Sequence, residues 1–356
     1  MPQLLSCVKP YRSNVSRILA QTLGTGILSN VAHEDELALM TAVARQYYIE
    51  GKTRVEIAEQ LDTSRFKVAR LLELARTLGV VTITIKPRGL VDSELSEKLK
   101  QRFGLTQALV VWADGDNPED LYGQLGRAAA RHLTETITTE DVLGFDTGRT
   151  VSRIADHLDS LPPCDVVQLS GLAGTVQLNG LEILRRVTEV NGGTAYPLYA
   201  PMIAPDASAA TAYRQQPELR MASERYRHLT TAIVSVGSWH PPVSQVHDRL
   251  NKTERQTLLK AGALAETCAL MFDQQGNPVE GLDDRRIGIP LDDLKAVPNV
   301  IAVAGGHDKA AAIHALLKSE IVTTMVTDIG TAERLLAAGG LAAQIQPTLQ
   351  PSRADA

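Results

Sequence analysis

One short stretch of the sequence combines glycines, a carboxylate, a cation and a hydroxyl at a spacing that suits anion binding. It reads Gly-Phe-Asp-Thr-Gly-Arg-Thr (144–150). It begins at the end of an apolar run that stops at Phe145, and the helical pattern VSRIADHL follows it. Glycines let the backbone approach a ligand closely, and amides at a helix start can hold an anion. The pattern predicts a phosphate-type site, although a simple tight strand–helix turn would also use these glycines. The candidate residues are Gly144, Asp146, Gly148, Arg149 and Thr150.

Three other predicted strand ends carry polar residues. After VIAVAGG, Lys309 falls in the first turn of a helix, where a cation opposes the helix dipole, so a compensating anion is expected. His307 beside it is interpreted as a helix cap or surface residue. Asp273 in FDQQG could accept hydrogen bonds from sugar hydroxyls, although D-x-x-G is also an everyday turn. Thr327 and Asp328 form a weaker candidate, either facing a ligand or capping the helix TAERLL.

No arrangement typical of a catalytic centre is present. The eight histidines are scattered, and the three cysteines form no zinc-ligand spacing. The sequence has neither a G-x-S-x-G elbow nor a Walker-type lysine loop. We therefore expect no catalytic residues, no metal and no cofactor. The few, distant cysteines suit a reducing cytoplasm, and no apolar run is long enough to span a membrane.

The strand ends would be positioned by an α/β domain that begins near Asp92. Apolar strand-like runs alternate with amphipathic helical stretches, which favours a mostly parallel sheet with ligands bound at the carboxyl ends of its strands. The predicted strands are 108–113, a run ending at Phe145, 165–169, 231–237, 268–272, 299–304 and 322–328. The predicted helices include 93–103, 118–136, 180–190, 251–264 and 309–318.

A second feature, residues 53–78, predicts two short helices joined by a tight turn. Thr53 and Glu56 match a capping box, and Asp62-Thr63-Ser64 ends one helix and caps the next. Apolar residues recur at i, i+3, i+4 and i+7 in the second helix, which indicates one buried face. These residues are Val68, Leu71, Leu72 and Ala75. This pattern is typical of a helix-turn-helix whose second helix enters the major groove of DNA.

Charge supports that interpretation over an ordinary helical hairpin with a solvated basic face. Residues 51–89 contain eight basic and four acidic side chains, a net charge of +4, in a chain whose net charge is −5. A basic island on an acidic protein suits contact with phosphates. The expected DNA contacts are Thr53, Arg54, Ser64, Arg65, Phe66, Lys67 and Arg70. Of these, the three cations of the second helix are expected in the groove, Phe66 against a thymine methyl, and Ser64 as a cap and phosphate contact.

At 356 residues the chain has room for several domains. We expect a poorly ordered extension over 1–32, an all-α DNA-binding domain over 33–88, a sugar- or phosphosugar-binding α/β domain over 89–338, and a flexible tail over 339–356. The first DNA-domain helix should begin near His33 and bury Leu37, Met40 and Ala44. Residues 80–87 should form a short strand or wing.

With these residues in view, the chain resembles bacterial transcriptional regulators of the SorC type (SorC/DeoR) over about residues 34–337. The helical part matches through Tyr47-Tyr48, Gly51, Glu56-Ile57-Ala58, Leu61, Ser64-Arg65, Val68, Arg70-Leu71-Leu72, Ala75 and Gly79-Val80. The remainder matches through VLGFDTGRT, YPLYAPMIA, VGSW, LMFDQQGNPV, VIAVAGGHDKAAAIHALL and VTDIGTAERLL. Ala69, where many members have serine, and Glu73, where a basic residue is common, depart from the pattern.

The resemblance implies a winged-helix-like DNA-binding domain on a domain of the sugar-phosphate-isomerase fold, usually working as a tetramer. It implies that Arg149, Thr150 and Lys309 hold a phosphate. It also implies that Asp273 contacts a ligand hydroxyl and that Asn179 makes a further polar contact.

The expected function is therefore a cytoplasmic transcriptional regulator of carbohydrate metabolism. Its partners would be a double-stranded DNA operator, a sugar or phosphosugar effector and three further copies of itself, with no membrane and no enzymatic activity. The alternative is a sugar-phosphate isomerase with an accessory helical module, for which Asp146 or Asp273 would be the base. A structural assembly protein would explain neither the basic island nor the glycine-rich strand ends.

Overall fold

The computed structural model describes residues 30–81, 91–113, 117–173 and 180–337, with side chains from Leu37 onward. Contacts divide the chain into two units, with the boundary between Lys86 and Pro87, and each unit is described by itself. Within the described ranges, no helix has the length and apolar character needed to cross a membrane.

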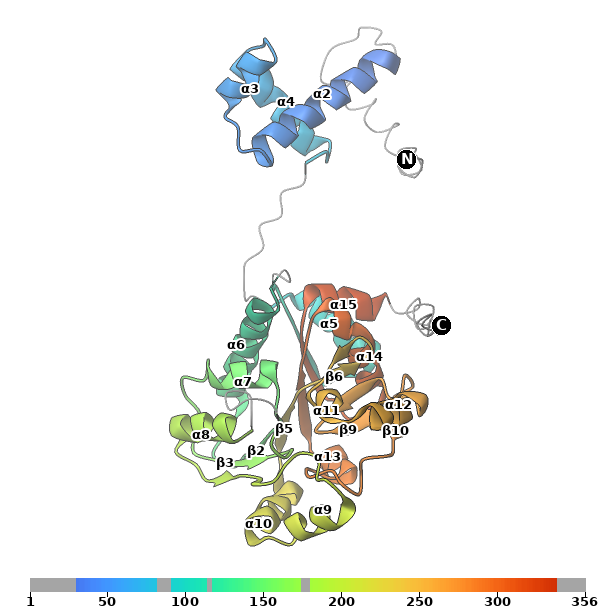
Figure 1. The fold of residues 1–356 in the computed structure, drawn as a ribbon. Helices are drawn as coiled ribbons and strands as arrows, with labels where there is room; N and C mark the ends of the chain where they lie inside the picture. The colour runs from blue at the N-terminus through green and yellow to red at the C-terminus, as the bar shows by residue number, and fades with distance from the viewer. Residues whose placement is uncertain (1–29, 82–90, 114–116, 174–179, 338–356) are drawn as a thin grey trace, which may run out of the picture. The chain divides into compact units, whose positions relative to one another are not determined.

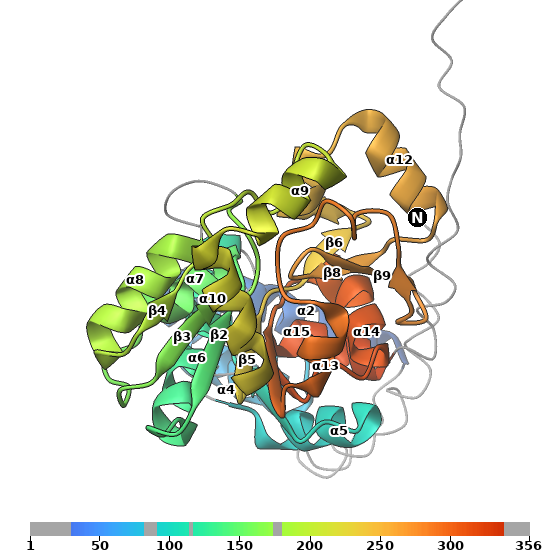
Figure 2. The same cartoon turned by 90° about the horizontal axis from the view of Figure 1, so that it is seen from below.

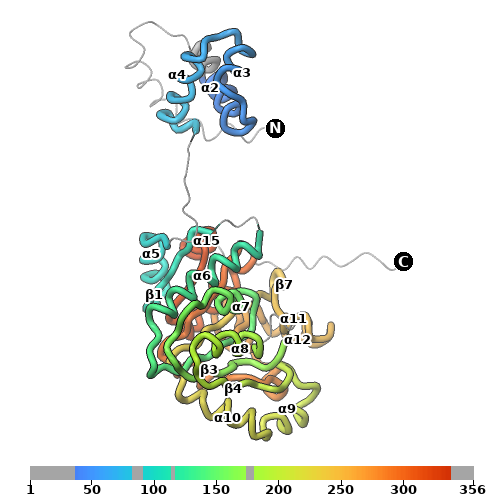
Figure 3. The backbone as a smooth tube through the Cα atoms, turned by 90° about the vertical axis from the view of Figure 1, so that its left-hand side faces the viewer, coloured from blue at the N-terminus to red at the C-terminus, as the bar shows by residue number. Residues whose placement is uncertain are grey.

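The described residues of the first unit form the helices α2 (Asn30–Tyr48), α3 (Arg54–Gln60) and α4 (Arg65–Thr77) (Figures 1 and 3). The predicted apolar stripe of α4 is buried, and it packs against α2 and α3. The face predicted for α2 was partly wrong, because Leu37 is exposed and Val43 is buried in its place beside Met40 and Ala44. The helix also begins three residues before His33.

Local hydrogen bonds fix the start of each short helix. The backbone amide of Thr53 donates to Glu56 Oε2 (2.7 Å), and the Glu56 amide donates to Thr53 Oγ1 (3.3 Å), which confirms the capping box. Between the helices, Asp62 has a left-handed φ of +44° and the Thr63 amide closes the end of α3. Ser64 then caps α4 by accepting a hydrogen bond from the Lys67 amide (3.2 Å). These bonds set where the exposed side chains of α4 begin.

The second unit contains a seven-stranded sheet, each of whose strand pairs is parallel. Its strands, in spatial order, are β1 (Gln107–Val111), β12 (Thr324–Asp328), β11 (Asn299–Val303), β5 (Thr231–Val234), β2 (Val142–Phe145), β3 (Asp165–Gln168) and β4 (Ala195–Tyr196). The sheet confirms the predicted α/β class, an N-terminal helical region followed by a mostly parallel sheet.

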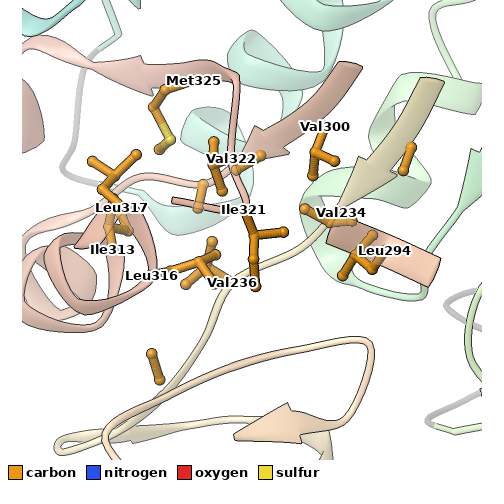
Figure 4. Packing of buried hydrophobic residues seen from close by; sticks show 14 of the residues in the cluster. Val234, Val236, Leu294, Val300, Ile313, Leu316, Leu317, Ile321, Val322 and Met325 are labelled. Carbon is orange, nitrogen blue, oxygen red and sulfur yellow. The ribbon is translucent and has the colours of Figure 1, made fainter. Parts of the chain in front are cut away.

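Helices cover both faces of this sheet (Figure 2). One face packs against α6 (Pro118–Thr136), α7 (Arg149–Ala155) and α8 (Gly180–Asn191), and the other against α5 (Ser93–Phe103), α13 (Leu291–Ala296), α14 (Ala310–Lys318) and α15 (Ile329–Leu336). Side chains alternate between the two faces along each strand, so Val300 belongs to one core and Ile301 to the other. Figure 4 shows the core on the side of α13 and α14, where Val300 packs near Val234 and Leu294.

A smaller antiparallel sheet lies beside α14. Its strands, in spatial order, are β10 (Pro278–Val279), β9 (Leu270–Phe272), β8 (Ala265–Thr267), β6 (Gly237–Trp239) and β7 (Pro242–Val243). The sequence did not predict this sheet. The run 231–237, expected as one strand, leaves the parallel sheet after Val234 and enters the small sheet at Gly237.

The run 268–272, also expected as one strand, was wrong in a more informative way. Cys268 and Ala269 form a two-residue turn between β8 and β9 with φ values of +49° and +58°. Such a hairpin turn normally uses Asn-Gly or a similar pair, because most side chains disfavour positive φ. Cys-Ala gives no turn signal, so the preceding strand β8 was missed.

The other described elements are α9 (Ala207–Arg214), α10 (Pro217–Arg225), η2 (Tyr226–His228), α11 (Gln245–Arg249), α12 (Lys252–Lys260) and η3 (His307–Lys309). Val80 and Val81 form a bend, and the rest of the predicted wing lies outside the described residues, as do the extension before Asn30 and the tail after Ala337.

Candidate functional site

A pocket lies at the carboxyl ends of β2, β5 and β11, which are neighbours in the parallel sheet. From β2 the chain proceeds outward to β3 and β4, whereas from β5 it proceeds the other way to β11 and β12. Ligands of open α/β sheets bind at such a point of divergence. The pocket is lined by Asp146–Thr150, Met202, Ser235–Gly237, Val243–Val246, Glu266–Ala269 and Lys309.

Asp146 is buried and holds the floor of this pocket together. Its Oδ1 accepts a hydrogen bond from Ser170 Oγ (2.6 Å), and its Oδ2 accepts from Ser235 Oγ (2.7 Å). The amides of Ser235 (3.2 Å) and Cys268 (3.3 Å) also point to Oδ2. Both carboxylate oxygens are therefore already used by the protein. This geometry suits a residue that positions three loops better than one that contacts a ligand or removes a proton.

The loop after β2 brings a cation to the pocket. A Cβ at Gly148 would lie 2.7 Å from the Ser235 Cβ, so only glycine allows this close approach. Arg149 follows as the first residue of α7, and its guanidinium lies over the ring of Tyr122, 5.2 Å from the ring centre. Thr150 is buried and also lines the pocket.

Lys309 brings a second cation from the loop after β11. Its Nζ donates a hydrogen bond to the carbonyl oxygen of Val236 (2.8 Å). Burial, and then the charge of Arg149, lower the pKa of Lys309 to about 8, while Glu266 acts in the opposite direction. Among the described residues, no carboxylate lies within ion-pair distance of Arg149 or Lys309. A bound anion would relieve the repulsion between these two cations.

Glu266, which the sequence did not single out, is a buried carboxyl in the opposite wall. It faces Gly237 across the β8–β6 pair, where a Cβ would lie 2.3 Å from Glu266 Cγ. Its Oε2 accepts a hydrogen bond from Trp239 Nε1 (3.0 Å), and Ser244 provides another hydrogen bond. Burial raises the pKa of Glu266 to about 7 despite these two donors.

Gln245 is the second residue of this wall that the sequence did not reveal. Its Oε1 is buried and has no hydrogen-bond partner among the residues that the structure describes, and the residue lines the pocket. A buried amide oxygen without a donor is costly, so the position favours a ligand hydroxyl. Recognising Glu266 and Gln245 required strand β8 and the start of α11, neither of which the sequence pattern indicated.

The Cys268–Ala269 turn, which follows Glu266 in the chain, is held in place from both sides. Arg286 is buried, and its Nη1 donates to the carbonyl oxygens of Cys268 (3.4 Å) and Ile289 (2.8 Å). Asp146 accepts from the Cys268 amide on the pocket side. The left-handed Cys268–Ala269 turn is thus held between a carboxylate and a guanidinium, and it sets the position of Glu266 two residues before it.

Several candidate residues do not line this pocket. Asp273 organises its own turn, since its Oδ1 accepts from the amides of Gln275 and Asn277 (2.8 Å each). Gly144 lies in β2, and a Cβ there would meet Leu169 at 2.6 Å, which is a packing constraint. Asn179 falls outside the described residues.

Two other candidates, His307 and Asp328, make contacts of a structural kind. His307 is exposed and lies 3.3 Å from the carboxylate of Asp308. Asp328 caps α15 by accepting from the Thr331 amide (2.9 Å), and it also accepts from the Gly306 amide (2.8 Å). Of the two readings of Asp328, the helix cap is therefore the one with observed hydrogen bonds.

In the helical unit, the expected DNA contacts on α4 share one property, namely exposure without an observed ion pair among the described residues. Phe66 has 72% of its surface exposed, and the Arg65 guanidinium lies 5.0 Å from its ring centre. Lys67 and Arg70 are also exposed. On α3, Arg54 lies over the ring of Tyr47 at 5.7 Å. An exposed aromatic ring among free cations suits contact with a polyanion that has apolar edges.

Comparisons with known proteins agree on the family. Residues 90–337 match the family model described as "Putative sugar-binding domain". The transcriptional regulator LsrR of Klebsiella pneumoniae subsp. pneumoniae is 30% identical over 313 residues, covering 85% of this chain and 94% of that protein. The deoxyribonucleoside regulator of Bacillus subtilis is 27% identical over 303 residues, covering 84% and 97%.

Among solved structures, the full-length sorbitol operon regulator SorC from Klebsiella pneumoniae has a TM-score of 0.64 at 22% identity. The match covers 85% of this chain and 99% of SorC, and it supports the fold. Together, the family model and the regulator sequences show that the chain belongs to the SorC-type (SorC/DeoR) family of bacterial transcriptional regulators with a sugar-binding domain.

Proposed function

We propose that this protein regulates genes of carbohydrate metabolism by binding an operator in double-stranded DNA, and that a phosphosugar in the described pocket controls this binding. The observation that carries the proposal is the pair of cations Arg149 and Lys309, which line one pocket at the strand ends and have no carboxylate within ion-pair distance in the described part of the chain. A phosphate group, with its multiple acceptor oxygens, matches two such donors. Thr150 is proposed as a hydroxyl donor to the same phosphate.

DNA contact is proposed for the helical unit. Arg65, Lys67 and Arg70 would enter the major groove, with Phe66 against a thymine methyl. The proposal also includes contacts of Ser64, Thr53 and Arg54 with the DNA backbone. The exposure of all these side chains and the positive charge of residues 51–89 support it.

Control of DNA binding requires two states with different affinities for the effector. A ligand that bound both states equally would shift nothing. We propose that these states are two subunit arrangements of a homotetramer. Asp273 is left out of the proposed contacts, because its carboxylate already accepts hydrogen bonds from its own turn.

The test combines a ligand screen with an operator assay. An operator is first selected from random DNA with the full-length protein, and sugars and sugar phosphates are then screened by thermal shift. We expect at least one sugar phosphate to raise the melting temperature and to change operator affinity in a fluorescence-anisotropy titration. A ligand that stabilises the protein and leaves operator affinity unchanged would contradict the regulatory proposal.

A second candidate function, sugar-phosphate isomerisation, is favoured by one observation. Glu266 lies in the pocket with its pKa raised to about 7, which suits a general base at neutral pH. The bases expected from the sequence fit less well, because the oxygens of Asp146 and Asp273 are occupied. An assay for aldose–ketose conversion of each bound sugar phosphate decides the matter, since an isomerase must show turnover that Glu266→Gln abolishes.

A further inference from the structure

The two walls of the pocket come from different sheets and differ in charge. Arg149 and Lys309 follow strands of the parallel sheet. Glu266 lies in β8 of the antiparallel sheet, and Gln245 is the first residue of α11, just after strand β7 of that sheet. A ligand that fills the pocket therefore meets cations on one wall and hydrogen-bond acceptors on the other.

The wall that carries the acceptors Glu266 and Gln245, here called the acceptor wall, has its carboxyl held in place by the protein. Trp239 Nε1 and Ser244 donate to the Glu266 carboxyl, and Gly237 leaves room for its side chain. Ser244 is itself fixed, since its Oγ accepts from the His247 amide (2.9 Å). The Gln245 Oε1 remains without a donor.

The wall opposite the cations carries a carboxyl that a ligand can meet. Asp146 already accepts four hydrogen bonds from the protein, so Glu266 is the pocket carboxyl that remains to face a ligand. A second phosphate next to the ionised carboxyl would be a close contact of like charges, which Glu266 could relieve only by taking up a proton. A hydroxyl in the same place would donate to Glu266 or Gln245.

We infer that the pocket selects an effector with a single anionic group, a sugar or polyol monophosphate whose other end presents neutral hydroxyls to Glu266 and Gln245, and that it rejects bisphosphates. This inference rests on the proposed function and narrows the class of effector. In this arrangement the cation wall supplies affinity for phosphate, and the acceptor wall supplies specificity for the rest of the molecule.

The experiment uses matched pairs that differ by one phosphate. Fructose 6-phosphate is compared with fructose 1,6-bisphosphate, and glucose 6-phosphate with glucose 1,6-bisphosphate, within a panel of three- to seven-carbon monophosphates and their free sugars. The full-length protein carries Trp112→Phe, which leaves Trp239, whose indole donates to Glu266, as its single tryptophan reporter. Dissociation constants are measured at pH 7.5 by fluorescence and by calorimetry.

At pH 7.5 we expect monophosphates to bind about fourfold more tightly than the paired bisphosphates, because Glu266, with its pKa raised to about 7, can take up a proton and so limits the repulsion. Glu266→Gln keeps the size of the side chain and its ability to accept from Trp239, and it removes the charge. It should remove most of the difference in affinity between monophosphates and bisphosphates by strengthening bisphosphate binding. Equal or tighter binding of bisphosphates to the unaltered pocket, or a ratio unchanged by Glu266→Gln, would overturn the inference.

A second variant keeps the inference testable if Glu266→Gln folds poorly. Gln245→Ala should weaken monophosphate binding by about tenfold and leave the affinity for inorganic phosphate unchanged, because inorganic phosphate needs only the cation wall. If Gln245→Ala weakens the binding of monophosphate and of inorganic phosphate equally, or changes neither affinity, the separate acceptor wall is contradicted.

The result also separates this inference from the proposed function. If monophosphates bind and change operator affinity but bisphosphates bind as tightly, the regulatory function stands and the inference falls. If no monophosphate in the panel binds, the phosphosugar effector is contradicted, and the inference falls with it.

Discussion

The helical unit and the pocket place their charged groups in opposite environments. On α4 the cations proposed to contact DNA, Arg65, Lys67 and Arg70, are exposed, and they lie within six residues of one another behind a local cap at Ser64. In the pocket the charged groups are largely buried and come from distant segments, since Asp146 and Cys268 are 122 residues apart. Substitutions on α4 should therefore change binding alone, whereas substitutions in the pocket should change binding and folding together.

The largest expected effect on stability is that of Asp146→Ala. It leaves four donors without their acceptor in a buried place, which costs about 3–5 kcal/mol of unfolding free energy. Chemical denaturation of this variant is compared with the exposed-site control Asp159→Ala, which should stay within about 0.5 kcal/mol of the parent. A loss below 1 kcal/mol for Asp146→Ala would show that its hydrogen bonds do not hold the loops.

A pH-dependent effect of similar size is expected at Glu266. Its pKa rises from an ordinary 4.5 to about 7 on folding, because the folded protein favours the protonated carboxyl. The stability that this protonation gives the folded protein is complete below pH 4.5 and is lost as pH rises through 7. Relative to Glu266→Gln, the parent should lose about 3 kcal/mol of unfolding free energy between pH 4.5 and pH 8. Lys309 titrates in both proteins, and its charge interacts with that of Glu266, so the difference reports Glu266 together with this coupling.

Denaturation curves at several pH values check this expectation, with Glu97→Gln as an exposed control that should show no such trend. A difference between parent and Glu266→Gln that stays constant with pH would mean that the carboxyl is solvated in the folded protein.

The smallest expected effect, and one confined to binding, is that of Arg70→Ala on α4. Loss of a base contact should cost about 1–3 kcal/mol of operator-binding free energy. Stability should change by less than about 0.5 kcal/mol because the side chain is exposed. Arg76→Ala, an exposed arginine in the last turn of the same helix, is the matched control. If both variants and the parent bind the operator with equal affinity at several salt concentrations, Arg70 does not contact DNA.

The helical unit could be predicted from sequence because its determinants are local. The Thr53–Glu56 capping box spans three residues, and the Val68–Ala75 stripe repeats within a single helix. Leu37 was misplaced because the face that a helix buries depends on its neighbours, which periodicity does not give. The parallel strands other than the short β4 could also be predicted, since buried β-branched runs alternate with amphipathic helices.

The pocket could be predicted only in part. Its cation wall follows glycine-rich strand ends, and the structure brings Arg149, Thr150 and Lys309 together as expected. The acceptor wall depends on a left-handed turn at Cys268–Ala269 and on a bend that carries the chain from β5 into a second sheet. Glu266 lies between two apolar runs and becomes visible only when β8 pairs with β6.

The most direct test of effector control is operator affinity with and without a bound sugar phosphate, measured for the parent, Lys309→Ala and the exposed control Lys318→Ala. Loss of a half-buried cation that is proposed to contact the phosphate should weaken effector binding by about 2–4 kcal/mol. We therefore expect Lys309→Ala to bind the operator like the parent without effector and to show no response at effector concentrations that saturate the parent and Lys318→Ala. A normal response of Lys309→Ala would contradict the assignment of this pocket as the effector site.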